Sequence, residues 1–207
     1  MKLIPLLSLL ALSTAAGASD FYLLGEFTHS KNTLGGNVFD SALSNAGATG
    51  LSSSVKGGSN QVRLQLGYKV NPNFALEGGY IDFGKAKYSS SYSVAGTPDT
   101  ATGTVKAGGL DIAALGILPL GDSFSLFGKA GLVAARVKST LASGSGVAGG
   151  SASSNVLRPL LGVGVSYKLN ENMDLRGEYD HVSGLGKSST TGKMNDNMLS
   201  FGLGYHF

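Results

Sequence analysis

The 207-residue sequence contains no cysteine, no tryptophan and only five prolines. Without cysteine the chain forms no disulfide and offers no thiolate, so hydrogen bonding and burial must hold the fold together. Beyond its N-terminal segment the chain has no run of eighteen apolar residues, which excludes a membrane-spanning helix. Neither positive nor negative charge dominates the composition. The formal net charge of +3 is too small an excess to indicate nucleic-acid binding.

The N-terminal segment has the features of a secretory signal peptide. It begins with Lys2, continues with an apolar run from Leu3 to Leu12 and ends with the small residues Ala16-Gly17-Ala18. The run is too short, and its flank too easily cleaved, for a membrane anchor. Residues 1–18 are therefore predicted to be a cleaved signal peptide, and residues 19–207 an exported domain.

The remainder is rich in glycine and serine, and several segments alternate strictly between large apolar and small or polar residues. The last segment, 197–207, places Leu199, Phe201 and Leu203 on one face and small residues on the other. Segment 61–70 alternates in the same way. A large apolar face opposite a small or polar one is typical of a strand that has lipid outside and a crowded lumen inside.

The alternating segments predict an all-β fold, an eight-stranded antiparallel up-and-down transmembrane β-barrel. The predicted strands are 21–29, 61–70, 74–84, 109–118, 124–138, 156–169, 173–182 and 197–207. Three short turns, at 71–73, 119–123 and 170–172, alternate with four long, loose loops, at 31–58, 85–103, 139–155 and 183–193. Short periplasmic turns and long extracellular loops are typical of outer-membrane barrels.

The register of 110–118 remains open. An inward Asp111 also places Leu115 and Ile117 inside the barrel, and a bulge near Gly108-Gly109 or a shifted register would avoid this.

Charged and polar residues mark the predicted inner face. They are Glu26, Arg63, Gln65, Lys69, Glu77, Lys129, Arg158, Arg176, Glu178 and Asp180. Side chains fill a barrel of eight strands, and an unpaired buried charge costs several kcal/mol, so these groups are expected to pair and plug the lumen. Glu77 and Arg176 lie at equal distance beyond their turns, in strands that face each other. We therefore expect an ion pair between them, with Lys129 and Glu178 one layer higher.

Three segments resemble the membrane domain of OmpA-type outer-membrane proteins: GYKVNPNFALEGGYIDFG, LRGEYD and NMLSFGLGYHF. The resemblance implies a barrel in the Gram-negative outer membrane with an interior charge network. It places Glu77 and Arg176 at the centre of that network, with Lys129 near them. Where the family often has a further Lys and a further Glu, this chain has Ala114 and Ser166.

The resemblance also concerns the end of the chain. It implies that Tyr205 and Phe207, in the closing strand, form the signal recognised by the barrel-assembly machinery. Family members commonly continue into a peptidoglycan-binding domain, and a sequence ending at Phe207 is expected to lack it. Because tryptophan is absent, tyrosines and phenylalanines must form any interfacial girdle. The tyrosine candidates are Tyr22, Tyr68, Tyr80, Tyr167, Tyr179 and Tyr205.

The predicted function is a structural and surface role in the envelope, as a monomer without cofactor or metal, since the three histidines are scattered. A small, low-conductance porin is the first alternative. A lipid A deacylase is the second, because His181 precedes Ser183 in a pattern that resembles that family. A soluble barrel of lipocalin type is the third.

The expected partners are outer-membrane lipids and lipopolysaccharide. Lysines in or beside the predicted loops favour contact with lipopolysaccharide phosphates. They are Lys31, Lys56, Lys85, Lys87, Lys138, Lys187 and Lys193.

Overall fold

The computed structural model describes residues 20–34 and 37–207, so the predicted signal peptide, residues 1–18, lies outside the described residues. Nine strands and one helix make up the fold. They are β1 (Phe21–Leu34), α1 (Asn37–Asn45), β2 (Ala48–Gly57), β3 (Ser59–Asn71), β4 (Phe74–Val94), β5 (Thr97–Pro119), β6 (Phe124–Ser143), β7 (Gly149–Lys168), β8 (Met173–Leu185) and β9 (Met194–His206). Within 20–34 and 37–207, no helix has the length and apolar character needed to cross a membrane.

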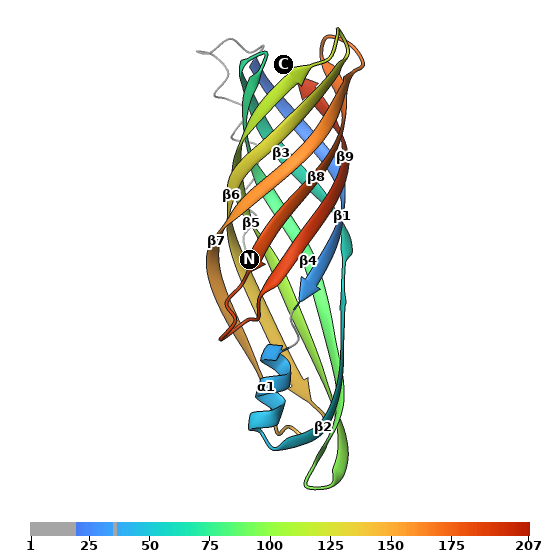
Figure 1. Cartoon of the computed structure of the whole chain (residues 1–207), viewed down its shortest axis with the longest axis vertical. Helices are drawn as coiled ribbons and strands as arrows, with labels where there is room; N and C mark the ends of the chain where they lie inside the picture. Colours follow the sequence, from blue (N-terminus) through green and yellow to red (C-terminus); the bar gives the residue numbers. More distant parts are fainter. Residues whose placement is uncertain (1–19, 35–36) are drawn as a thin grey trace, which may run out of the picture.

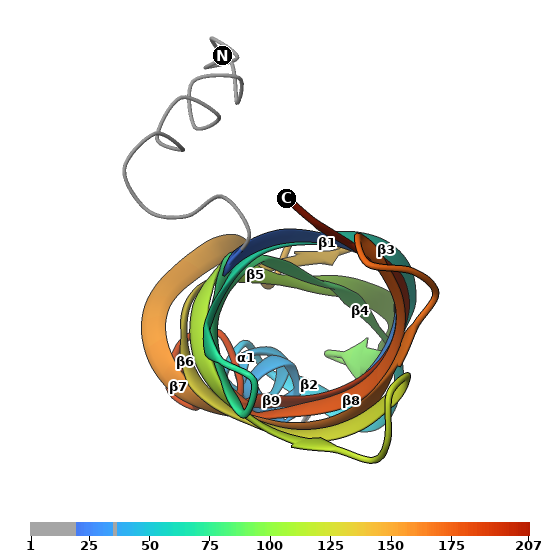
Figure 2. The ribbon, with the colours of Figure 1, turned by 90° about the horizontal axis from the view of Figure 1, so that it is seen from above.

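Eight of the strands close into a ring (Figure 2). Neighbouring strands follow the order β4-β3-β1-β9-β8-β7-β6-β5, and β5 pairs with β4 again. Every pairing is antiparallel. Closure leaves no unpaired edge where the wall is complete. The predicted eight-stranded antiparallel barrel is confirmed.

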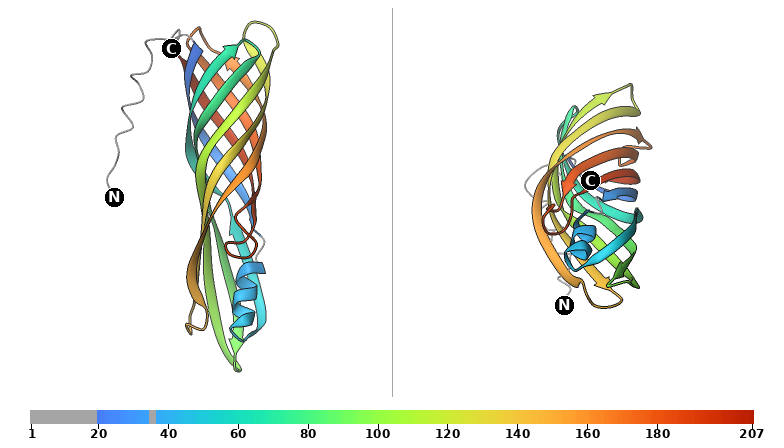
Figure 3. Two further views of the ribbon diagram at one scale, coloured as in Figure 1. Left: turned by 90° about the vertical axis from the view of Figure 1, so that its left-hand side faces the viewer. Right: turned by 60° about the horizontal axis from the view of Figure 1, so that its bottom comes forward.

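The two ends of the barrel differ. Short turns join β3 to β4, β5 to β6 and β7 to β8 at the end where β1 begins and β9 finishes, which we call the turn end (Figure 1). The opposite end, the hairpin end, carries α1 and β2 (Figures 1 and 3). The predicted short turns are therefore all present and all on one side.

The long loops expected at the hairpin end are mostly regular structure, which corrects the prediction. Strands β4 and β5 stay paired as far as Val94 and Thr97, and β6 and β7 as far as Ala142 and Gly149. The predicted loop 31–58 contains α1 and the additional strand β2, which pairs with the hairpin-end part of β4. These segments form strands because apolar or aromatic residues continue to alternate with polar ones, as a half-buried strand requires.

The alternation reverses its sense along the wall. Near the turn end the outward residues are apolar, as at Leu110 and Ile112, and Asp111 between them is buried. Near the hairpin end the inward residue is apolar, as at Val105, and Lys106 beside it is exposed. The barrel therefore carries an outer apolar belt only over its turn-end part.

The register of 110–118 is regular. Asp111, Ala113 and Leu115 are buried, and the pairing of β5 with β6 runs unbroken from Ala101 to Pro119. The irregularity lies instead in β4, between Asp82 and Lys85, where Gly84 has φ of 71°. A positive φ suits glycine because it has no Cβ.

An apolar core fills the interior toward the hairpin end. Phe39 and Leu43 of α1 are buried in it, and the Phe39 ring lies 4.8 Å from the ring of Tyr88 in β4. Fully buried residues of the barrel wall continue the core from α1 toward the turn end. They include Ile81, Phe83, Val105, Val133, Val137, Leu160, Val182 and Met198. The helix thus covers the open end of the barrel.

Candidate functional site

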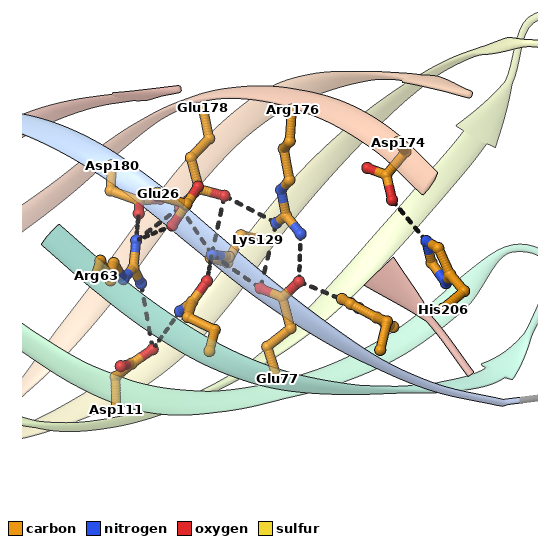
Figure 4. Close-up of polar contacts among 12 residues, drawn as sticks. Glu26, Arg63, Glu77, Asp111, Lys129, Asp174, Arg176, Glu178, Asp180 and His206 are labelled. Atoms are coloured by element: carbon orange, nitrogen blue, oxygen red, sulfur yellow. Dashed lines mark hydrogen bonds and ion pairs between the residues drawn. The ribbon is translucent and has the colours of Figure 1, made fainter. Parts of the chain in front are cut away.

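A continuous network of ion pairs crosses the turn-end half of the lumen (Figure 4). The Arg176 guanidinium pairs with Glu77 through Nη1, and its Nη2 lies 2.8 Å from Glu178 Oε2. Lys129 Nζ lies 3.0 Å from Glu77 Oε2 and 3.0 Å from Glu178 Oε1. The structure thus brings together the four residues expected to pair. Lys129 joins the two carboxylates instead of forming a separate upper layer.

Arg63 is the second centre of the network. Its Nη1 lies 2.6 Å from Glu178 Oε1 and 2.6 Å from Asp180 Oδ2, and its Nη2 lies 3.3 Å from Asp111 Oδ2. The side chain is 2% exposed. A planar guanidinium with five N–H donors suits such contact with several carboxylates better than an ammonium would. Asp111, whose orientation the sequence left open, belongs to the network.

The network holds more acid than base. Five carboxylates face three cations, Arg63, Lys129 and Arg176. The carboxylates are Glu26, Glu77, Asp111, Glu178 and Asp180. Among the described residues, neither carboxylate oxygen of Glu26 has a hydrogen-bond partner, and its Oε2 lies 3.7 Å from Arg63.

Tyr22 corrects a prediction. It was expected in the outer tyrosine girdle, but its side chain is buried and its hydroxyl donates to Glu77 Oε1 at 2.7 Å. Tyr22 lies four residues before Glu26 in the same strand. Because side chains alternate between the two faces, the residue at 22 points to the same side as the inward Glu26. Its ring lies over Gly67 on β3, where any Cβ would collide with it. The other five girdle candidates face outward, partly or fully exposed.

Two further residues predicted to lie in the interior are away from the network. Lys69 is near the turn-end mouth, and Arg158 lies nearer the hairpin end, where its Nη2 donates to the Gly186 carbonyl at 3.2 Å. Ala114 points outward, because its neighbours Ala113 and Leu115 are buried, so its position cannot accommodate an interior lysine. Ser166, by contrast, faces the lumen.

A cavity of about 270 Å³ opens at the turn end. Lys69, Lys168 and Asp174 lie along its wall. Its inner end is Arg176, whose guanidinium lies 4.2 Å from the centre of the Phe127 ring. The cavity therefore reaches the charge network.

His181 and Ser183 lie toward the hairpin end of β8. His181 Nδ1 lies 2.7 Å from Asn197 Oδ1, and the Tyr179 hydroxyl donates to the same oxygen at 3.0 Å. An amide does not stabilise an imidazolium as the carboxylate of a catalytic triad does. In the part of the chain that the structure describes, no cluster of three potential metal ligands occurs.

The closing strand presents both predicted assembly residues outward. Tyr205 and Phe207 are 47% and 45% exposed, and their ring centres lie 5.3 Å apart. The Phe207 amide donates to the Phe21 carbonyl at 3.1 Å, which joins the two ends of the ring.

The model of the OmpA-like transmembrane domain matches residues 26–207, nearly all of the described chain. The chain belongs to this family. Outer membrane protein A of Serratia marcescens is 32% identical over 143 residues, which cover 69% of this chain and 38% of that protein. A Coxiella burnetii protein is 27% identical over 169 residues, which cover 70% and 67% of the two chains. This chain thus spans little more than a third of the first relative.

Solved structures agree on the fold. Ail of Yersinia pestis superposes with a TM-score of 0.53 at 14% identity, covering 91% of this chain and 99% of that one. Neisserial surface protein A superposes with a TM-score of 0.51 at 17% identity, covering 90% and 97%. Both are small outer-membrane barrels. At these identities they support the architecture alone.

Proposed function

We propose that this protein is a closed, non-enzymatic barrel that serves a structural role in the envelope of a Gram-negative bacterium, after export and removal of residues 1–18. The turn end then faces the periplasm and the hairpin end the cell surface. The observation that carries the proposal is that two successive layers of buried side chains fill the lumen. The first is the charge network and the second is the apolar core beneath α1.

The two layers act on ions in different ways. The charge network excludes water because its groups pair with one another, so a rearranged pair would admit an ion. The apolar core offers a hydrated ion few polar partners, because its buried polar groups Ser30, Asn32 and Asp196 already bond to one another, and dehydration makes the passage of an ion costly. A closed barrel is therefore expected to stay closed when one pair is broken.

Single-channel conductance of the refolded protein in planar bilayers tests this function. Wild type and Arg176→Ala are both expected to be silent, and Arg158→Ala serves as the matched arginine control outside the network. Conductance steps in wild type would contradict the proposal and support the porin. Steps that appear only in Arg176→Ala would make the Glu77–Arg176 pair a gate.

A low-conductance pore is the second candidate, because the 270 Å³ cavity already leads from the turn end to Arg176.

The expected monomer is tested by light scattering of the refolded protein. Assembly through the closing strand predicts that Phe207→Ala accumulates less folded barrel in the outer membrane than Phe201→Ala, a matched phenylalanine of the same strand.

The deacylase alternative makes a separate prediction. If His181 and Ser183 were catalytic, Ser183→Ala would change the number of acyl chains in extracted lipid A. The proposal expects no change. Ser200→Ala, on the adjacent strand, is the control.

A further inference from the structure

Three lysines stand directly opposite one another on the outer face of three adjacent strands. In the registers of the barrel, Lys85 of β4 is the partner of Lys106 of β5, and Lys106 is the partner of Lys138 of β6. All three are exposed and point away from the lumen. We call Lys85, Lys106 and Lys138 the lysine ladder.

Other cations extend the lysine ladder on the same face. On β4, Lys87 is exposed two residues from Lys85 toward the hairpin end, and on β6, Arg136 is exposed two residues from Lys138 toward the turn end. Lys56 on β2 is the register partner of Lys87. Among the described residues no ion pair involves any of these six side chains. The nearby acid, Asp82, accepts a hydrogen bond from the Gly84 amide at 2.7 Å.

Three opposed lysines destabilise the folded protein when no anion is bound between them. Directly opposed residues of an antiparallel pair have Cβ atoms about 4.5 to 5.5 Å apart, and like charges there destabilise the sheet. The cost disappears when anions lie between the ammonium groups. A ligand that carries more than one negative charge is therefore expected.

The position of the lysine ladder indicates where that ligand comes from. On β5, Leu110 is exposed in the apolar belt, and Lys106 lies four residues further toward the hairpin end. At about 3.3 Å per residue, the two are roughly 13 Å apart along a tilted strand. The lysine ladder therefore lies just outside the belt, at the level of lipid headgroups, on the wall and away from the hairpin tips.

We infer that the lysine ladder binds the phosphate groups of a diphosphorylated glycolipid of the outer leaflet, of the lipid A type. Lysine ammonium groups are compact point charges that bind phosphate oxygens. On the turn-end side of the lysine ladder, the apolar side chains Ile112 and Leu132 are exposed at 63% and 47% and can contact acyl chains. This inference goes beyond the proposed function, since it concerns the outer wall and holds whether or not the lumen conducts.

The experiment measures binding of diphosphorylated lipid A by the refolded full-length barrel in neutral detergent. The test variant is Lys85→Gln/Lys106→Gln/Lys138→Gln. The matched control, Lys31→Gln/Lys187→Gln/Lys193→Gln, removes three exposed lysines elsewhere at the hairpin end, which the sequence grouped with the ladder lysines Lys85 and Lys138 and which the inference separates from them. Because each lysine near an anionic surface contributes severalfold, the test variant is expected to bind at least about tenfold more weakly, and the control within about twofold of wild type.

Thermal unfolding gives an independent readout. Without lipid A, the test variant is expected to unfold at or above the wild-type temperature, because the repulsion is removed. Diphosphorylated lipid A is expected to raise the midpoint of wild type and of the control, but not that of the test variant. If the triple variant does not fold, Lys106→Gln, which removes the middle lysine, is expected to show a smaller loss of affinity.

Three results would overturn the inference. The first is equal binding by wild type and the test variant. The second is equal binding of lipid A with and without its phosphates. The third is ladder-dependent binding of a sulfated oligosaccharide with no binding of lipid A, which would assign the surface to a soluble polyanion.

Discussion

The charge network and the apolar core fill the same barrel, yet they hold their parts of the chain by different forces. In the turn-end half, lipid outside offers nothing to a polar group, so the polar side chains turn inward and must satisfy one another. In the hairpin-end half, the outer face meets water, and the interior is mostly apolar, as in a soluble protein, with only a few mutually bonded polar groups such as Ser30 and Asp196. The medium outside the wall thus decides what lies inside it.

The two regions also differ in how they fail. Each ion pair of the network depends on the others, because Glu178 contacts Arg63, Lys129 and Arg176 together. Removing one cation leaves buried carboxylates without compensation. Removing one apolar side chain from the core leaves a cavity whose cost stays local.

The largest effect is expected for Arg63→Met. This change removes the cation that contacts Glu178, Asp180 and Asp111, and an uncompensated buried charge costs about 3 to 5 kcal/mol. Denaturant unfolding of the refolded protein in lipid vesicles measures the loss of unfolding free energy.

The matched control for Arg63→Met is Glu26→Gln. Glu26 has no hydrogen-bond partner among the described residues and adds to the excess of acid, so its neutralisation is expected to change the unfolding free energy by less than about 1 kcal/mol, or to increase it. Equal losses for the two variants would show that burial alone, and not charge balance, determines stability in the network.

A smaller, local effect is expected for Leu43→Ala in α1. Leu43 is fully buried in the apolar core, and truncation of a buried leucine costs about 3 kcal/mol. The helix contacts only the hairpin end, so protease cleavage within 37–45 is expected to accelerate while the barrel stays intact. Ser44→Ala, at an exposed position of the same helix, should leave the cleavage rate unchanged. Loss of the whole barrel would contradict the separation of the two regions.

The smallest effect is expected at the hairpin tips, for Asp99→Asn. Hydrogen bonds from the Ser145 hydroxyl, and then from the Tyr92 hydroxyl at 2.6 Å, hold the pKa of Asp99 well below its usual range. These bonds link the β4–β5 hairpin to the turn between β6 and β7. Because the folded pKa is depressed, their contribution is complete above the unfolded pKa of about 3.9 and is lost as pH falls through the folded value.

Hydrogen exchange of residues 144–148 checks the Asp99 prediction. Wild type is expected to be better protected than Asp99→Asn at pH near 5, and the difference should shrink well below pH of about 4. A difference that grows toward low pH would have the wrong sign for a depressed carboxyl pKa.

Much of the turn-end half follows from the sequence. Alternation at Leu64, Leu66 and Tyr68 requires lipid outside and places Arg63 and Gln65 inside, without reference to any other strand. Glu77 and Arg176 lie the same number of residues beyond their short turns, and this alone predicts that they reach the same depth in the barrel. Tyr22 shares the parity of the inward Glu26 on β1, so the alternation of that strand contains its inward direction as well.

The hairpin-end half was harder to predict. Alanine, serine and glycine there have low strand propensity and look like loop residues, although Ala86, Tyr88 and Tyr92 alternate with polar neighbours. Their strand conformation depends on pairing with partners distant in the sequence and on the apolar face beneath α1. Propensity is outweighed by tertiary contacts in such segments.

The sequence by itself determined the barrel, because a period of two and the sorting of short turns from long connections are local features of the chain. Only the tertiary structure decided which charges meet, that an apolar core fills the hairpin-end half, and that Lys85, Lys106 and Lys138 form one row. Those contacts depend on the register between strands, and register is set by closure of the whole ring.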